Sequence, residues 1–83
     1  MRVRVKLFAT YREIVGRREL AWPIHAGDTI GTVVDGLVVK HPGLGPFRDT
    51  MLLAVNEEFV HADVALADGD EVAIMPPVSG GIA

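Results

Sequence analysis

Hydrophobic and charged residues alternate at the start of the chain, with the period of two that is typical of a strand with one buried face. The hydrophobic positions are Val3, Val5 and Leu7, and the charged ones are Arg2, Arg4 and Lys6. A strand is expected over residues 2–7. A second alternation predicts a strand over residues 19–24, with Leu20, Trp22 and Ile24 on its inner side. Because Pro23 has no N–H to donate, this second strand should lie at an open edge of a sheet.

The middle of the chain changes to a helical period. Its hydrophobic stripe consists of Ile30, Val33, Val34, Leu37 and Val38. This spacing predicts an amphipathic helix over residues 29–41, with Thr29 as its N-cap and Pro42 just beyond its end. Gly31 and Gly36 lie inside it and are poor helix formers, so packing against a sheet must hold the helix. A shorter helical turn is expected over residues 10–15, closed by Gly16 in a left-handed cap.

The second half of the chain predicts short strands separated by turns. Strands are expected over residues 51–55, 59–60 and 71–75, with a loop over 44–50 and an Asp68-Gly69-Asp70 turn before the last strand. One long helix crossing a mixed sheet of four or five strands buries one face of each layer. The element order places the first and last strands side by side in the middle, so we expect an α+β, β-grasp (ubiquitin-like) domain over residues 1–77.

Composition excludes several classes of function. The 83 residues include no cysteine, so disulfides, thiolate metal sites and a catalytic thiol are impossible. The net charge of −3 argues against a nucleic-acid partner. No apolar run approaches the roughly 20 residues that span a bilayer, and His25, His41 and His61 are too scattered to suggest a metal site. We expect a cytoplasmic protein that binds no metal, nucleic acid or membrane.

The end of the chain predicts a flexible arm over residues 78–83. The last strand meets Pro76-Pro77, which favours a stiff segment without backbone donors, and the chain should leave the sheet there. The only Gly-Gly pair, Gly80-Gly81, follows and is itself followed by Ile82-Ala83. One such pair is expected by chance in a chain of this composition. A chain end without side chains is nevertheless what a second protein needs in order to act on a carboxylate.

Five segments in order carry a resemblance to a known family. They are Lys6-Leu7-Phe8-Ala9, Arg12-Glu13 with Gly16, Ala54-Val55-Asn56, Leu66-Ala67-Asp68-Gly69-Asp70-Glu71-Val72-Ala73 and Pro76-Pro77-Val78-Ser79-Gly80-Gly81. From Val5 to Gly81 the chain resembles the small subunit of molybdopterin synthase, a relative of the thiamine-pathway sulfur carrier and, more distantly, of ubiquitin. The Pro-Pro-Val-Ser lead-in favours the molybdopterin branch.

The resemblance implies a sulfur carrier for molybdenum cofactor biosynthesis that is not an enzyme on its own. A ubiquitin-activating-type enzyme would use ATP to adenylate the carboxylate of Gly81, and a persulfide would convert it to a thiocarboxylate. The large subunit of molybdopterin synthase would then take the sulfur, and the carrier itself would bind no cofactor. The residues expected to contact partners are Phe8, Arg12, Met75, Pro76, Pro77, Val78, Ser79 and Gly80. Core positions for Phe8 and Met75, and a plain exposed charge at Arg12, are the alternatives.

Ile82-Ala83 depart from this pattern, because they leave Gly81 in an ordinary peptide bond. Some sulfur carriers of similar type are made with short extensions that a protease removes. A cloning remnant, or a protein that has lost the chemistry, would also explain the two residues. Three other functions stay open beside the molybdopterin hypothesis. They are a ubiquitin-like modifier joined to lysines through Gly81, a sulfur carrier for another pathway, and a β-grasp binding module without chemistry.

Overall fold

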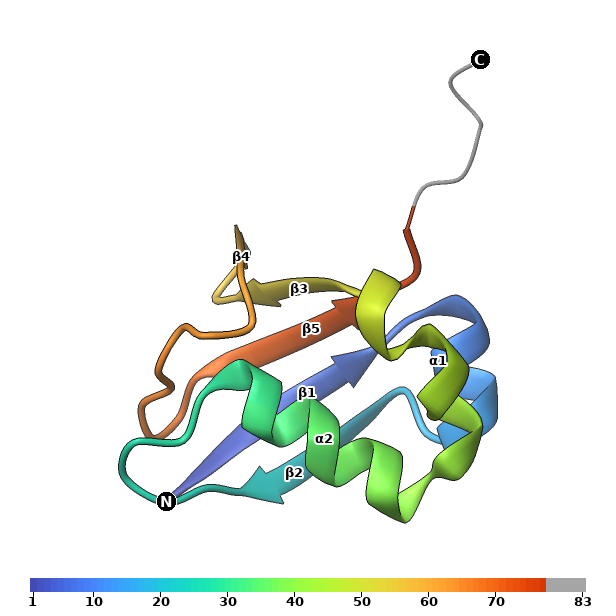
Figure 1. Cartoon of the computed structure of the whole chain (residues 1–83). Helices are drawn as coiled ribbons and strands as arrows, with labels where there is room; N and C mark the ends of the chain where they lie inside the picture. The colour runs from blue at the N-terminus through green and yellow to red at the C-terminus, as the bar shows by residue number, and fades with distance from the viewer. Residues whose placement is uncertain (78–83) are drawn as a thin grey trace.

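A five-stranded mixed sheet forms one layer of the structure, in the order β2-β1-β5-β3-β4. The computed structural model describes residues 1–77, and residues 78–83 lie outside the description. The strands are β1 (Arg2–Leu7), β2 (Glu19–Pro23), β3 (Leu52–Val55), β4 (Glu58–Val60) and β5 (Glu71–Met75). The helices are α1 (Ala9–Val15), α2 (Ile30–Lys40) and the 3₁₀ segment η1 (Pro42–Thr50). Figure 1 shows α2 crossing one face of the sheet.

The first and last strands are neighbours inside the sheet. β1 and β5 run parallel, with Val5 opposite Val72 and Leu7 opposite Ile74. β2 pairs antiparallel with β1 at one edge, and β3 pairs antiparallel with β5 on the other side. This is the predicted β-grasp arrangement, and Pro23 lies on the edge strand as expected.

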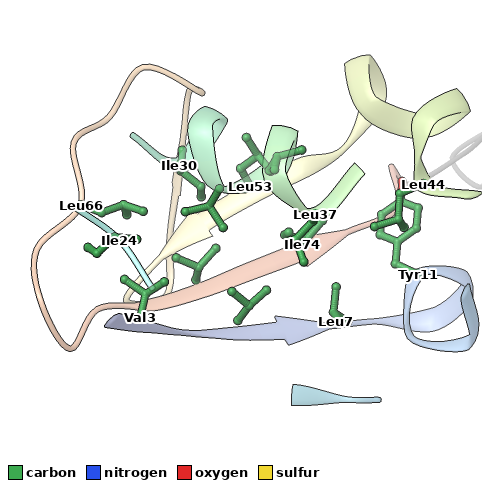
Figure 2. Close-up of a cluster of buried hydrophobic side chains, with 14 residues drawn as sticks. Val3, Leu7, Tyr11, Ile24, Ile30, Leu37, Leu44, Leu53, Leu66 and Ile74 are labelled. Carbon is green, nitrogen blue, oxygen red and sulfur yellow. The ribbon is translucent and has the colours of Figure 1, made fainter. Parts of the chain in front are cut away.

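The core lies between α2 and the sheet face that the alternation predicted. Ile30, Val33, Val34 and Leu37 of α2 are buried, with Val38 partly buried beside them. Figure 2 shows Leu37 directed toward Ile74 of the central strand. The sheet contributes Val3, Val5, Leu7, Leu53, Val72 and Ile74, and Val55 is partly buried against them. Burial of these side chains is the main stabilising term, because the short strands and the valine-rich helix have little stability alone.

The two glycines in α2 mark places where the helix is approached closely. A Cβ on Gly31 would lie 2.9 Å from the carbonyl oxygen of Ala62, the oxygen that accepts the Gly31 N–H at 2.8 Å. A Cβ on Gly36 would lie 2.8 Å from Cζ2 of Trp22. Glycine therefore lets the backbone at Ala62 and the indole of Trp22 lie directly on the helix. These two contacts compensate for the poor helix propensity of Gly31 and Gly36.

The structure corrects one element and adds to the core. Residues 44–50, predicted as a loop, belong to η1, which begins at Pro42 and buries Leu44. Pro42 at the first position of η1 loses no intrahelical hydrogen bond, so it can start the segment. Tyr11 of α1 is also buried, and Figure 2 shows it beside Leu44 at the same end of the cluster. Gly16 ends α1 with a φ of 85°, the left-handed cap that was predicted.

Candidate partner-docking site

The end of the last strand determines where the chain leaves the sheet. β5 ends at Met75, which is half-buried, and Pro77 two residues later is exposed. Since β5 lies between β1 and β3, the chain departs from the interior of the sheet rather than from an edge. Figure 1 shows this end of β5 next to the start of α1.

Phe8 and Met75 lie beside each other at this exit. The pairing of Leu7 with Ile74 places the next residues, Phe8 and Met75, in adjacent positions, and the Phe8 N–H donates to the Ile74 carbonyl at 3.3 Å. Leu52 pairs with Met75 from the opposite side. Since Leu7 and Ile74 point into the core, Phe8, Met75 and Leu52 form a row on the face turned away from α2. Phe8 is 41% exposed, so neither the phenyl ring nor the half-buried Met75 is a fully buried core residue.

A second apolar row continues across β5, β3 and β4. Ala73 pairs with Ala54, and Ala54 pairs with Phe59. The phenyl ring of Phe59 is 72% exposed, and it lines a shallow hollow together with Leu52. We call the surface formed by Phe8, Leu52, Phe59, Ala73 and Met75 the docking face. Phe8 and Phe59 are exposed and the other three residues are half-buried, so this face is a candidate protein-interaction surface.

Basic side chains lie at the margin of the docking face near the chain exit. Phe8 and Arg12 line one hollow with Lys6 and Arg18. The ammonium of Lys6 forms an ion pair with Glu71 at 3.4 Å, whereas Arg12 and Arg18 form none with any residue in 1–77. Two cations beside an exposed phenyl ring could meet acidic groups of a partner.

The acidic residues of the Asp68-Gly69-Asp70 turn have partners within the domain. Asp68 accepts the N–H of Arg2 at 2.8 Å, and Asp70 accepts the N–H of Ala67 at 2.8 Å. The Asp68 carboxylate therefore ties this turn to the start of β1, whereas the Asp70 carboxylate bonds within the turn itself. In residues 1–77 no group of three or more His, Cys, Asp or Glu residues is arranged to hold a metal ion. No helix in this part of the chain is long and apolar enough to cross a membrane.

The environment of Tyr11 in α1 shifts the pKa of its phenol. Burial raises the pKa of its phenol above the ordinary value of 10.0, because ionisation would place a charge in the core. Its hydroxyl has no hydrogen-bond partner in the described part of the chain, and its ring packs against Phe47 with centroids 5.5 Å apart. Tyr11 therefore belongs to the core and not to the docking face.

The structure brings together part of the predicted site. Phe8 and Met75 lie beside each other at the exit of the chain, Arg12 lines a hollow with Phe8, and Pro76 and Pro77 follow Met75 along the chain. Val78, Ser79, Gly80 and Gly81 lie outside the described residues, as does the predicted arm over residues 78–83. Leu52, Ala73 and Phe59 were not predicted as docking residues. The continuous apolar run of residues 51–55 was the available signal, since a strand that is apolar at every position presents hydrophobic side chains on both faces.

The sheet order, the single long helix and the exit of the chain from a central strand define a ubiquitin-like β-grasp domain. The ThiS family model matches residues 5–81, and the chain belongs to that family.

Relatives in the family bear two kinds of name. The molybdopterin synthase sulfur carrier subunit of Arabidopsis thaliana is 39% identical over 79 residues, covering 95% of this chain and 82% of that protein. Small archaeal modifier protein 3 of Haloferax volcanii is 35% identical over 92 residues, covering 98% of this chain and 100% of that protein.

Solved structures share the fold. The crystal structure of SAMP1 from Haloferax volcanii has a TM-score of 0.84 at 34% identity, covering 98% of this chain and 100% of that chain. A chain in the complex of subunits 1 and 2 of molybdopterin-converting factor from Helicobacter pylori has a TM-score of 0.67 at 24% identity, covering 98% of this chain and 100% of that chain. The second likeness concerns the fold alone.

Proposed function

We propose that this protein is the sulfur carrier subunit of a molybdopterin synthase and acts in molybdenum cofactor biosynthesis. One observation carries the proposal: the central strand of a ThiS-family domain ends beside an exposed apolar face, and the sequence Pro-Pro-Val-Ser-Gly-Gly directly follows that strand. The similarity to the Arabidopsis sulfur carrier subunit supports the same role. The protein would not be an enzyme alone. It would be the sulfur-donating member of a two-protein sulfurtransferase.

The reacting group in this proposal is the carboxylate of Gly81. A carboxylate is a poor electrophile, so a ubiquitin-activating-type partner would first use ATP to form an acyl adenylate with release of pyrophosphate. A persulfide would displace AMP, and a thiol would then cleave the sulfur–sulfur bond and leave the thiocarboxylate. The carrier would bind no cofactor itself. Gly80 would allow the chain to pass through a narrow slot, because it carries no side chain.

The larger subunit would be held by the docking face, with Phe8 and Met75 as its anchors. Aromatic and methionine side chains are favoured at the centres of protein interfaces. Arg12 would supply a charged contact at the margin. The stretch of chain that leads into the partner would consist of Pro76, Pro77, Val78 and Ser79, and these residues would contact it. The printed name of the Arabidopsis relative, a subunit, supports a second protein in the assembly. The cytosol is the compartment that goes with this proposal.

Ile82-Ala83 must be removed before Gly81 can react, because a peptide carbonyl offers no carboxylate to adenylate. A processing protease is therefore part of the proposal. The adenylation test compares the 83-residue chain with a chain ending at Gly81, each mixed with the adenylating enzyme, ATP and labelled pyrophosphate. Only the shortened chain should drive exchange of pyrophosphate into ATP. Gly81→Ala in the shortened chain keeps the carboxylate but adds a methyl group, and exchange should be slow. Equal exchange by the 83-residue and shortened chains would overturn the requirement for processing.

A ubiquitin-like modifier is the second candidate, and the similarity to small archaeal modifier protein 3 favours keeping it. Both functions use the same activated glycine, so adenylation does not separate them. Mass spectrometry of the protein isolated from its own cells does. A chain ending at Gly81 with one oxygen replaced by sulfur supports the carrier. Isopeptide bonds from Gly81 to lysines of other proteins support the modifier.

A further inference from the structure

The edge strand β2 presents unpaired backbone groups. The N–H of Leu7 donates to the Arg18 carbonyl, and the N–H of Ile24 donates to the Met1 carbonyl. The backbone N–H and C=O groups of the even-numbered residues from 18 to 24 therefore point toward β1. In an antiparallel ladder the residues between them direct both backbone groups the other way. Glu19 and Ala21 therefore present N–H and C=O groups at the open edge, and β2 is the outermost strand on this side. Pro23 offers only a carbonyl there, so a ladder of hydrogen bonds would lose its donor at this point.

A groove runs along this edge on the side of the sheet that faces α2. Val15, Leu20 and Trp22 are partly buried against the core and line the groove, because α2 does not fully cover the edge strand. The contact of Trp22 with Gly36 places the indole directly on the helix and makes it a floor for the groove. This surface lies on the opposite face of the sheet from the docking face, so the two can be occupied at once.

The groove carries positive charge although the whole protein is acidic. Arg17 and Lys40 both line it, on a chain with a net charge of −3. Neither cation forms an ion pair with any residue in 1–77. The ammonium of Lys40 lies 5.9 Å from the centroid of the Trp22 ring, a cation–π distance that holds the charge above the apolar floor.

We propose that this groove binds an extended, acidic segment of a partner protein, which adds to β2 as a sixth strand. The backbone of the segment would bond to Glu19 and Ala21. Every second side chain of the segment would point to the α2 side, where apolar residues fit against Leu20 and Trp22. Acidic residues flanking them would meet Arg17 and Lys40. The proposal is independent of sulfur transfer and would let a second partner hold the carrier while its docking face and chain end are in use.

The first test uses a synthetic peptide of alternating valine and threonine, with aspartates at both ends, and the full 83-residue chain. Trp22 is the only tryptophan, so its fluorescence reports directly on the groove. The peptide should change this fluorescence and shift the amide resonance of Ala21 in NMR spectra, leaving Phe8 and Met75 unchanged. The same peptide with a central proline should bind at least about tenfold more weakly, because the added strand would lose a donor. Shifts confined to the docking face would overturn the proposal.

The second test exchanges the charges. The double variant Arg17→Glu with Lys40→Glu should bind the aspartate peptide about tenfold or more less tightly. It should bind a matched lysine peptide more tightly. Arg12→Glu makes one such charge change outside the groove and should change the two affinities far less than the double variant does. Circular dichroism verifies that each variant is folded. Equal affinity of both peptides for the unaltered protein would overturn the proposal. A concentration-dependent dimer that protects the Ala21 amide without peptide would also overturn it, since a second copy would then be the occupant.

Discussion

The side chain of Asn56 donates from Nδ2 to Oδ1 of Asp70 at 3.1 Å, and its oxygen accepts the N–H of Glu71 at 3.0 Å. Asn56 lies in the β3–β4 turn with a φ of 50°, a left-handed conformation that asparagine tolerates better than most residues. The same Asp70 accepts the N–H of Ala67 through its other oxygen at 2.8 Å. Two turns far apart in the chain are therefore joined beside the central strand.

Removing the Asn56 side chain should destabilise the domain. Asn56→Ala loses two hydrogen bonds, each worth about 1 kcal/mol, and leaves a residue with a Cβ in the left-handed region. Asn56→Gly loses the same bonds without that strain, so its unfolding free energy should fall less. Urea unfolding followed by circular dichroism measures both. If the two variants are equally stable, backbone strain at residue 56 does not contribute.

Two of the four valines of α2, Val34 and Val39, test the core assignment. Val34 is 1% exposed and Val39 is 82% exposed. Val34→Asp should prevent folding, because an unpaired carboxylate would lie in the core. Val39→Asp makes the same chemical change and should alter the unfolding free energy by no more than about 0.5 kcal/mol. Far-UV circular dichroism and urea unfolding separate the two results. A folded Val34→Asp protein with near-normal stability would contradict the packing described.

Tyr11 should make stability depend on pH in the alkaline range. Burial raises the pKa of Tyr11 in the folded state. Its contribution to the unfolding free energy is therefore complete below the pKa of the unfolded chain, about 10, and is lost as the pH rises through the raised pKa of the folded state. The unfolding free energy of Tyr11→Phe should therefore fall less steeply with rising pH than that of the unaltered protein. Tyr11 is the only tyrosine, so its ultraviolet titration can be followed without interference from another phenol.

At neutral pH, Tyr11→Phe should be neutral or stabilising by about 1 kcal/mol, since it removes a buried hydroxyl that has no partner in the described structure. A variant in which the same position is made smaller, Tyr11→Ala, should lose several kcal/mol through the cavity that it creates. A marked loss of stability in Tyr11→Phe would show that the hydroxyl does make a hydrogen bond.

The docking face should contribute to binding of the larger subunit without contributing to folding. Phe8→Ala and Phe59→Ala should each weaken the complex by about fivefold or more, since anchoring aromatic residues carry much of the energy of an interface. Met75→Ala should have an effect in the same direction. Titration calorimetry with the large subunit measures the affinities, and Val39→Ala on the exposed side of α2 provides the control. Unchanged affinity for all three variants would remove the docking face from the interface.

The sequence alone determined the elements that depend on local periodicity. The alternation at Val3, Val5 and Leu7 and the stripe on α2 define which side chains are buried, because side-chain direction follows from backbone geometry within one element. The hydrophobic pattern and the order of elements were enough for the β-grasp fold. The resemblance carried by the Pro-Pro-Val-Ser-Gly-Gly segment was enough for the family.

Only the tertiary structure decided which residues meet across elements. The row of Phe8, Met75 and Leu52 depends on the register of three strands, and the bond between Asn56 and Asp70 depends on two turns approaching each other. Leu44 and Tyr11 are buried because η1 and α1 pack at one end of the core, although each lies in a segment whose sequence shows little amphipathic pattern. Register and packing are set by contacts between distant parts of the chain, and the local spacing of hydrophobic residues does not contain them.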